Sequence, residues 1–341
     1  MSNKDLLTAS YDYNLPKEFI ATSPARPADS ARLLVYNRAN KSITHTAFAN
    51  ILDYIPANCS IFLNDTKVIK ARIYGKKSSG GKVELLVIKP LINNQYIAMI
   101  KGRVKAGITV EFEQNLKATI ENLNPDGSRV VKFYMQDKEL NFEQLVKILE
   151  KIGHIPLPPY INREDSKEDE LDYQTLFAKE DGSVAAPTAS LHFTPELLEK
   201  LYTLHDIHTL TLHVGAGTFK PVDAINIQEH PMHSEYYNIP DTAQTVIDSK
   251  KKILAVGTTV TRTIEFYART KKSSGECDLF LHPKNPPIRV DYLLTNFHLP
   301  KSTLIMLVSA FLGRDETLRV YNNAIKNQYR FYSYGDGMLI I

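Results

Sequence analysis

Hydrophobic and polar residues alternate in short segments along the first part of the chain. Residues 32–36 and 60–63 are short apolar runs that predict buried strands. Further strand-like segments lie between residues 82 and 135, where glycine-containing turns separate them. Several short strands at roughly even spacing are typical of a small all-β barrel or sandwich. The strands expected in this region are 82–89, 95–101, 108–112, 117–123 and 129–135.

A helical period follows this β region. Apolar residues recur on one face between Phe142 and Ile152, and Asn141 can cap this helix. Thr194-Pro195 combines a cap with a first-turn proline and predicts a second helix. The rest of the chain alternates strand and helix patterns, with strands expected at 207–214 and 252–256 and helices near 303–312 and 316–326.

Both ends of the chain therefore have α/β character, whereas the middle has β character. At 341 residues the chain exceeds the size at which a single hydrophobic core usually stops growing, about 300 residues. We expect an α/β domain formed by both chain ends, residues 1–65 and 153–341. We expect an inserted all-β, barrel-like domain with its following helix at residues 66–152.

Cysteine content and hydropathy bear on the compartment of the protein. Only Cys59 and Cys277 are present, whereas a secreted chain of this length more often carries several pairs. The N-terminal residues lack a basic start followed by an apolar core, and no run approaches the ~18 apolar residues of a membrane span. We therefore expect a cytoplasmic protein without membrane contact. No His or Cys spacing typical of zinc is present, so we expect no metal site.

The charge of the chain is unevenly distributed. The net charge is only +3, but residues 66–117 contain eleven Lys and Arg against three Glu. A local excess of this kind can attract phosphate backbones and release their counterions. A lysine-rich surface that is merely solvated would give the same count, so both interpretations stay open at this point.

The strand expected at 207–214 has a polar face and leads into a glycine turn. Thr209, Thr211 and His213 would point to the same side of this strand. Gly215 and Gly217 follow, and they would let backbone N–H groups approach a ligand closely. A tight turn without a ligand is equally compatible with the pattern. The third glycine and the acidic partner of a dinucleotide fingerprint are absent, which argues against a nicotinamide enzyme.

Further candidate residues lie beside turns and helix starts. His192 ends a run of small residues and could act near neutral pH, although a histidine near a helix cap also serves structural roles. Glu235 follows His233 by two residues, so the two could form an acid–base pair or a surface ion pair. His298 precedes a helix whose N-terminus suits a carboxylate or phosphate, or is an ordinary cap. Asp336 follows aromatic residues that could stack on a purine or pack in the core.

Long motifs link this chain to a known family. The stretches LTNFHLPKSTL (294–304), TLHVGAGTFKPV (211–222) and YRFYSYGDGML (329–339) resemble those of the S-adenosylmethionine:tRNA ribosyltransferase-isomerase family of queuosine biosynthesis. Further similar stretches extend over nearly the whole chain. The chain departs from the family pattern at 283–287, where a Pro-Gly-aromatic turn is usual, and at Ser190, where glycine is usual.

The resemblance implies a reaction on tRNA that carries 7-aminomethyl-7-deazaguanine at the wobble position. The ribosyl part of S-adenosylmethionine (AdoMet) would be transferred and rearranged to an epoxycyclopentanediol, which gives epoxyqueuosine-tRNA and releases adenine and methionine. AdoMet is then a consumed co-substrate, and no resident cofactor is expected. The α/β domain and inserted β-barrel of the family agree with the architecture expected above. We expect the protein to be a monomer.

This reaction needs a base for the C5′ proton beside the sulfonium and an acid near the departing adenine. As catalytic residues we expect His192, His213 and Glu235, with Asp336 as a further candidate. The AdoMet site is expected to include Thr188, Gly215, Gly217, Thr218 and His298. The tRNA backbone is expected to contact Arg72, Lys82 and Arg103, because they lie in the basic β segment.

Two other functions stay open from the sequence. An AdoMet-dependent methyltransferase could use residues 214–217 as its glycine loop and would form S-adenosylhomocysteine. A non-catalytic RNA-binding module could be built on the basic β segment, but it would leave the polar motifs of the α/β part unexplained. The products formed from AdoMet distinguish these functions.

Overall fold

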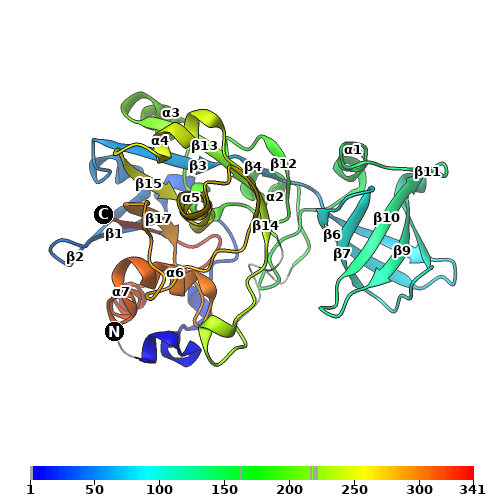
Figure 1. The fold of residues 1–341 in the computed structure, drawn as a ribbon, viewed down its shortest axis with the longest axis horizontal. Coiled ribbons are helices and arrows are strands. Elements are labelled where there is room, and N and C mark those ends of the chain that lie inside the picture. Colours follow the sequence, from blue (N-terminus) through cyan, green and yellow to red (C-terminus); the bar gives the residue numbers. More distant parts are fainter. Residues whose placement is uncertain (1–2, 162, 216, 218–221) are drawn as a thin grey trace.

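The structure is a computed structural model that describes residues 3–161, 163–215, 217 and 222–341. A larger α/β domain and a smaller β-barrel lie side by side, joined by two passages of the chain (Figure 1). Segments from both ends of the chain build the α/β domain, and the barrel is inserted between them. The predicted fold class is confirmed.

A closed ring of six antiparallel strands forms the barrel. The strands pair in the order β10-β7-β6-β5-β8-β9, and a further pairing between β9 and β10 closes the ring. The short β11 pairs with β10 beside the ring. The bounds are β5 (Arg72–Lys77), β6 (Lys82–Pro90), β7 (Gln95–Lys101), β8 (Thr109–Phe112), β9 (Lys117–Leu123), β10 (Arg129–Met135) and β11 (Lys138–Glu139).

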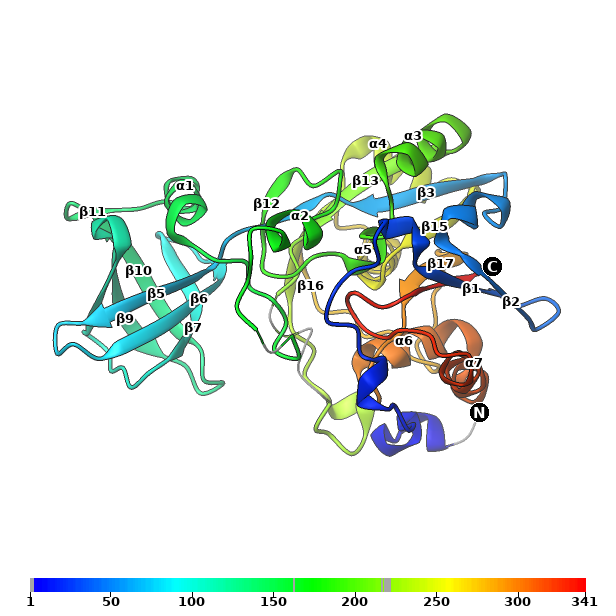
Figure 2. The same ribbon diagram turned by 180° about the vertical axis from the view of Figure 1, so that it is seen from behind.

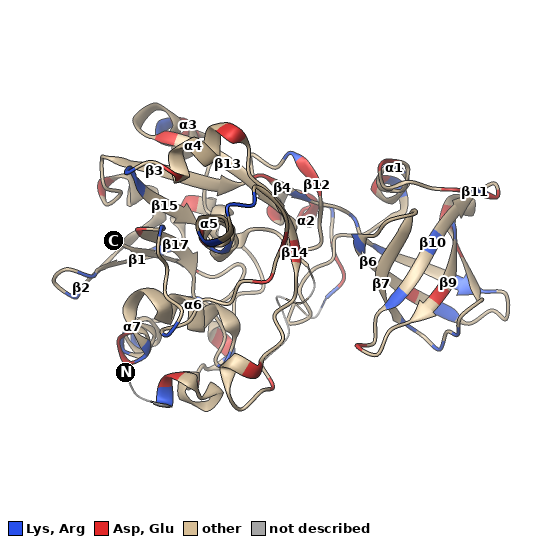
Figure 3. Cartoon of the chain, viewed as in Figure 1, with Lys and Arg blue, Asp and Glu red and all other residues tan. Residues whose placement is uncertain are grey.

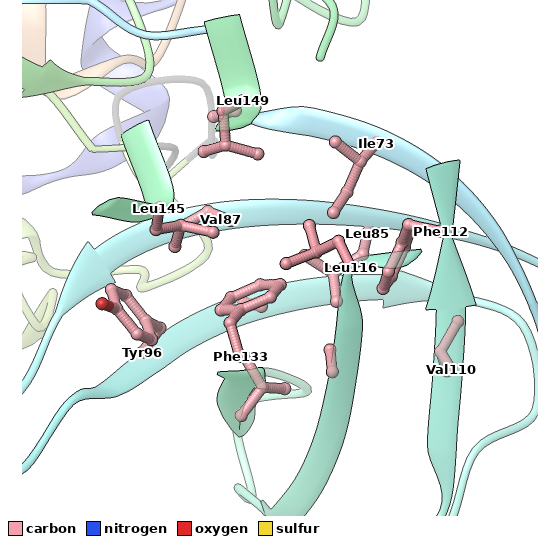
Figure 4. Packing of buried hydrophobic residues seen from close by; sticks show 14 of the residues in the cluster. Ile73, Leu85, Val87, Tyr96, Val110, Phe112, Leu116, Phe133, Leu145 and Leu149 are labelled. Carbon is pink, nitrogen blue, oxygen red and sulfur yellow. The ribbon is translucent and has the colours of Figure 1, made fainter. Parts of the chain in front are cut away.

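Alternating apolar residues fill the barrel. Val83, Leu85 and Val87 of β6 are buried, while the residues between them are more exposed. Helix α1 (Phe142–Ile152) adds Leu145 and Leu149 to the same core cluster (Figure 4). The bounds of this helix agree with the sequence pattern because its start is fixed locally by a capping box between Asn141 and Gln144.

In the described part of the α/β domain, nine strands form the central sheet, in the order β16-β14-β13-β3-β15-β17-β18-β1-β2. The strands β13, β3, β15 and β17 are mutually parallel, so their carboxyl ends lie at one edge of the sheet. The bounds are β1 (Arg32–Asn37), β2 (Ser42–Ala47), β3 (Cys59–Asn64), β13 (Asp206–Leu212), β14 (Glu235–Asn238), β15 (Lys252–Val256), β16 (Ser274–Cys277), β17 (Tyr292–Asn296) and β18 (Gly337–Ile340).

Helices cover both faces of this sheet. In β1, Leu34 and Tyr36 share a core cluster with α6 and α7, whereas Leu33 and Val35 share another with α3. Helices α4 and α5 pack in a third cluster with β13 and β15. The bounds are α2 (Asp169–Asp172), α3 (Pro195–Leu204), α4 (Asp241–Ile247), α5 (Thr258–Thr270), α6 (Thr303–Leu312) and α7 (Arg314–Lys326). The longest described helices have 13 residues, fewer than the ~20 that cross a bilayer.

A small parallel ribbon lies where the two domains meet. It pairs β4 (Thr66–Val68), which leads from β3 toward the barrel, with β12 (Glu180–Ser183). Figure 2 shows β12 and α2 on the side of the α/β domain that faces the barrel. The chain enters and leaves the barrel at neighbouring points, because the backbones of Arg72 and His154 hydrogen-bond to each other. The inserted barrel follows the carboxyl end of β3, because β4 leads from that end toward the barrel.

Candidate active site

A large cavity lies between the barrel and the α/β domain. Its volume is about 620 Å³, within the range of about 300–1,000 Å³ that is typical of small-ligand sites. The barrel side comes from β6, β7, the β9–β10 turn and α1, and the opposite side comes from β12, β14, β16 and the segment after β13. Its polar lining residues include Lys89, Asn124, Asp126, Ser128, Asp181, His213, Glu235, Tyr236 and Glu276.

Two smaller cavities, of about 40 and 60 Å³, follow the carboxyl ends of the parallel strands. The first shares Gly217, His233 and Glu235 with the large cavity. It shares Thr258 and Thr259, in the first turn of α5, with the second small cavity. The three cavities therefore adjoin one another and form a tract at the edge where α/β sheets usually bind their ligands.

His213 lies just beyond β13, where it lines the large cavity. The strand expected at 207–214 ends at Leu212, whose N–H and C=O are both bound by the Asn64 side chain. His213 Nδ1 lies 2.8 Å from the Thr66 hydroxyl. Burial lowers the pKa of His213, an effect that nearby acidic residues oppose. The imidazole is therefore neutral near pH 7.

Glu235 forms a buried ion pair instead of an acid–base pair with His233. One carboxylate oxygen lies 2.5 Å from Arg262 Nη1, and the other accepts the Gly215 N–H at 2.8 Å. Arg262 also donates to the carbonyl oxygens of Cys277 and Leu279, and its pKa is raised despite burial because of the Glu235 charge. This arrangement holds the start of the glycine turn against α5. The expectation of an acid–base role for Glu235 stays a prediction, and the contacts favour a positioning role.

The glycine turn reaches both the large cavity and one small cavity. Gly215 and Gly217 line the large cavity, and a Cβ atom on Gly217 would overlap the His233 ring. Only glycine therefore allows this close approach of His233. The expected AdoMet contact Thr218 lies outside the described residues.

Thr188 and His192 meet at Asn296. Thr188 donates to Asn296 Oδ1 at 3.0 Å, and Asn296 Nδ2 lies 3.2 Å from His192 Nε2. Thr188 and Asn296 line the second small cavity, whereas His192 packs against Phe48 with a ring separation of 4.8 Å. Burial, with a smaller effect of Arg330, lowers the pKa of His192 to about 3. His192 is thus a neutral support for Asn296 in this structure.

His298 lines the second small cavity from the turn before α6. Its Nε2 lies 2.9 Å from the Thr295 hydroxyl, and its backbone carbonyl accepts from Tyr13. Burial lowers the pKa of His298 to about 3, so it also remains neutral. It is placed where a bound ligand could contact it, but not as a charged group.

Asp336 does not line this tract, although Tyr332 and Ser333 of the same turn line the second small cavity. Its carboxylate is buried and accepts bonds from the backbone N–H groups of Arg32 and Arg330 and from the Arg330 guanidinium. These contacts tie the C-terminal turn to β1. Asp336 is not among the described residues that line the three cavities. Its position therefore does not support the predicted catalytic role.

The three candidate tRNA contacts occupy different positions on the barrel. The Arg72 side chain is engaged in contacts at the domain junction, where it donates to the Leu157 carbonyl and lies 3.6 Å from Glu84. Lys82 and Arg103 are exposed. Figure 3 shows Lys and Arg on several barrel strands, interrupted by acidic residues. Exposed Lys82 and Arg103 remain available to a phosphate backbone, whereas Arg72 supports the junction.

Sequence reasoning missed three groups that the fold brings to the tract. Asn296 lies inside the LTNFHLPKSTL motif, and its position before a predicted helix was a usable signal. Arg262 lies on a helix, 27 residues from its partner Glu235, so no local pattern indicates the pair. Thr66 and Gly182 come from β4 and β12, whose pairing no local pattern indicates. Among the described residues, no group of three or more His, Cys, Asp or Glu side chains is arranged to hold a metal ion.

A β-barrel carried on an α/β sheet, with a ligand-sized polar cavity between them, defines a two-domain protein with an interdomain site. A family model described as "Queuosine biosynthesis protein" matches residues 8–340. The chain belongs to this family of queuosine biosynthesis proteins.

Individual relatives resemble the chain over nearly its whole length. An S-adenosylmethionine:tRNA ribosyltransferase-isomerase of Aliarcobacter butzleri is 63% identical over 98% of this chain and 99% of the relative. One of Campylobacter jejuni is 62% identical over 99% of this chain and 100% of the relative. The crystal structure of an S-adenosylmethionine tRNA ribosyltransferase from Thermotoga maritima is similar with 34% identity and a TM-score of 0.55, covering 97% of this chain and 100% of that one.

Proposed function

We propose that the protein is an S-adenosylmethionine:tRNA ribosyltransferase-isomerase. It transfers the ribosyl group of AdoMet to 7-aminomethyl-7-deazaguanine at the tRNA wobble position and isomerises it, which gives epoxyqueuosine-tRNA, adenine and methionine. The observation that carries this proposal is the near full-length identity of 63% to a relative of that name. AdoMet is consumed in the reaction, and no resident cofactor or metal takes part.

The connected cavities support two substrates that meet at the domain boundary. AdoMet occupies the tract along the strand ends, where Gly215, Gly217 and Thr188 line the cavities. The first turn of α5, with Thr258 and Thr259, offers N–H groups to a carboxylate such as that of methionine. The modified base of the tRNA enters the large cavity from the barrel side. In this proposal, an RNA-borne amine lies beside a sulfonium nucleoside.

The chemistry assigns different tasks to the residues of the tract. The sulfonium makes the C5′ protons acidic, and adenine departs more easily when a donor contacts its ring nitrogens. Of the candidate histidines, His213 lines the large cavity and His298 lines a small one, and burial lowers the pKa of His192, His213 and His298 alike. Glu235 positions Gly215 through the buried pair with Arg262. The side chain that removes the C5′ proton is left open.

The proposal is tested with purified protein, AdoMet and tRNA carrying 7-aminomethyl-7-deazaguanine. Free adenine, methionine and the modified nucleoside are quantified by chromatography and mass spectrometry, with unmodified tRNA as the control substrate. Adenine that forms in a one-to-one ratio with epoxyqueuosine supports the proposal. S-adenosylhomocysteine as the product would instead indicate a methyltransferase, and tRNA binding without turnover would indicate a binding module. Activity that persists after treatment with a chelator supports the absence of a metal.

A further inference from the structure

The β4–β12 ribbon forms a cradle for His213. The two strands pair in parallel, with Thr66 opposite Glu180 and Lys67 opposite Asp181. The register shifts between Asp181 and Ser183, which leaves Gly182 as the irregular position. His213 contacts both strands, since Thr66 belongs to β4 and Gly182 belongs to β12. The ribbon thus surrounds a ring that also lines the large cavity.

Thr66 determines which nitrogen of His213 carries the proton. The Thr66 side chain is fully buried, and within the described chain its hydroxyl has one hydrogen-bond partner, His213 Nδ1 at 2.8 Å. If Nδ1 carried a proton, it would donate to Thr66, and the hydroxyl proton would be buried without an acceptor. An unsatisfied buried donor is costly, so Thr66 donates and Nδ1 accepts. The neutral ring then carries its proton on Nε2.

Gly182 leaves room for this ring orientation. A Cβ atom on Gly182 would lie 2.8 Å from both Cε1 and Nε2 of His213, closer than real contacts of this kind. The φ angle of Gly182 is +152°, which is also unfavourable for other residues. The His213 backbone is fixed as well, because its N–H donates to the Tyr236 carbonyl at 2.9 Å. The ring is therefore constrained by Thr66 and Gly182, and its backbone is held by Tyr236.

We propose that Thr66 and Gly182 are positioning residues that make His213 present an Nε2–H donor to the substrates in the large cavity. In the described part of the chain, Nε2 has no protein hydrogen-bond partner, so this donor is available to a ligand. The inference rests on the proposed function. It deepens that function, because an Nε2–H group stabilises negative charge on a nitrogen or oxygen of the substrate and cannot itself accept the C5′ proton.

Burial keeps the ring neutral although the nearby charges oppose this state. Asp65 at the end of β3 and Glu180 and Asp181 in β12 favour the protonated ring, whereas burial disfavours it and has the larger effect. Lys67 in β4 lies 3.1 Å from Asp181 and weakens the influence of that carboxylate. Tyr236 in β14 is stacked over His213 at a ring separation of 5.9 Å.

Nuclear magnetic resonance of 15N-histidine-labelled protein tests the tautomer directly, with a His213→Gln variant to assign the signal among the ten histidines. We expect the Nε2–H tautomer in the free protein and a change of about tenfold in the tautomer ratio in Thr66→Val, as for loss of one hydrogen bond. Thr66→Ser keeps the hydroxyl and should keep the tautomer. An Nδ1–H tautomer in the unmodified protein would overturn the inference.

Turnover gives the second readout. We expect kcat for adenine release to fall at least about tenfold in Thr66→Val and in Gly182→Ala, with the KM for tRNA unchanged and the activity restored in Thr66→Ser. Thr209→Val, in β13, is the matched control and should behave as the parent protein. Full turnover with an unaltered pH profile in Thr66→Val overturns the inference. A parent protein that releases no adenine refutes the proposed function instead, and the tautomer measurement still decides the inference.

Discussion

The buried pair of Glu235 and Arg262 permits a quantitative prediction for Glu235→Gln. Both side chains are nearly inaccessible, with 5% and 9% exposure, and the Arg262 charge has Glu235 as its close acidic partner. The substitution keeps the size of the side chain and an oxygen for the Gly215 N–H, but it leaves the guanidinium uncompensated. Removing one partner of a buried pair costs about 3–5 kcal/mol. We expect that loss in the free energy of unfolding.

Urea unfolding followed by circular dichroism and tyrosine fluorescence measures this loss, since the chain has 18 Tyr and no Trp. The double variant Glu235→Gln/Arg262→Met removes the charge as well and should be no less stable than the single variant. Lys147→Met is the control, because its pair with Glu143 is 71% and 78% exposed and should contribute less than about 1 kcal/mol. A Glu235→Gln protein within about 1 kcal/mol of the parent would refute the argument.

Three further outcomes are expected. Burial depresses the pKa of His192 and His298 from 6.5 to about 3. Below pH 6.5 the unfolded chain therefore binds protons that the folded chain does not. The free energy of unfolding should then fall with decreasing pH. At pH 5 to 6 each histidine contributes about 1.0–1.3 kcal/mol per pH unit, and His298→Gln should reduce that slope in urea titrations. Neutralising Lys82 and Arg103 should weaken tRNA binding and lower its salt dependence by about 0.7–0.9 per lost phosphate contact, and an unchanged slope in binding titrations would contradict this. Gly335→Ala should destabilise the protein by more than about 2 kcal/mol in thermal unfolding, because its Cβ would overlap the Phe331 backbone.

The sequence predicts those features whose causes are local. The barrel strand expected at 82–89 is observed at Lys82–Pro90, because burial on one side imposes a period of two. The helix at Phe142–Ile152 is predicted correctly because its capping box lies within four residues. The resemblance predicts that Thr188, Gly217 and His298 share one site, and in the structure these residues line adjoining cavities.

The remaining site features depend on contacts between distant parts of the chain. Glu235 was paired with His233 because the two are neighbours in sequence, whereas the structure pairs it with Arg262 through the packing of α5 on the sheet. His213 was placed inside a strand, but the Asn64 side chain ends that strand at Leu212. No periodic pattern could reveal these contacts, because single polar side chains determine them.

The insertion point of the barrel links the architecture to the site. β3 ends at the carboxyl edge of the sheet, and β4 follows at once with Thr66, which holds His213. The next residue, Lys67, lies 3.7 Å from Glu150 in the helix that packs on the barrel core and 3.1 Å from Asp181 in the ribbon. The segment that carries the chain into the barrel is therefore also the segment that orients the ring.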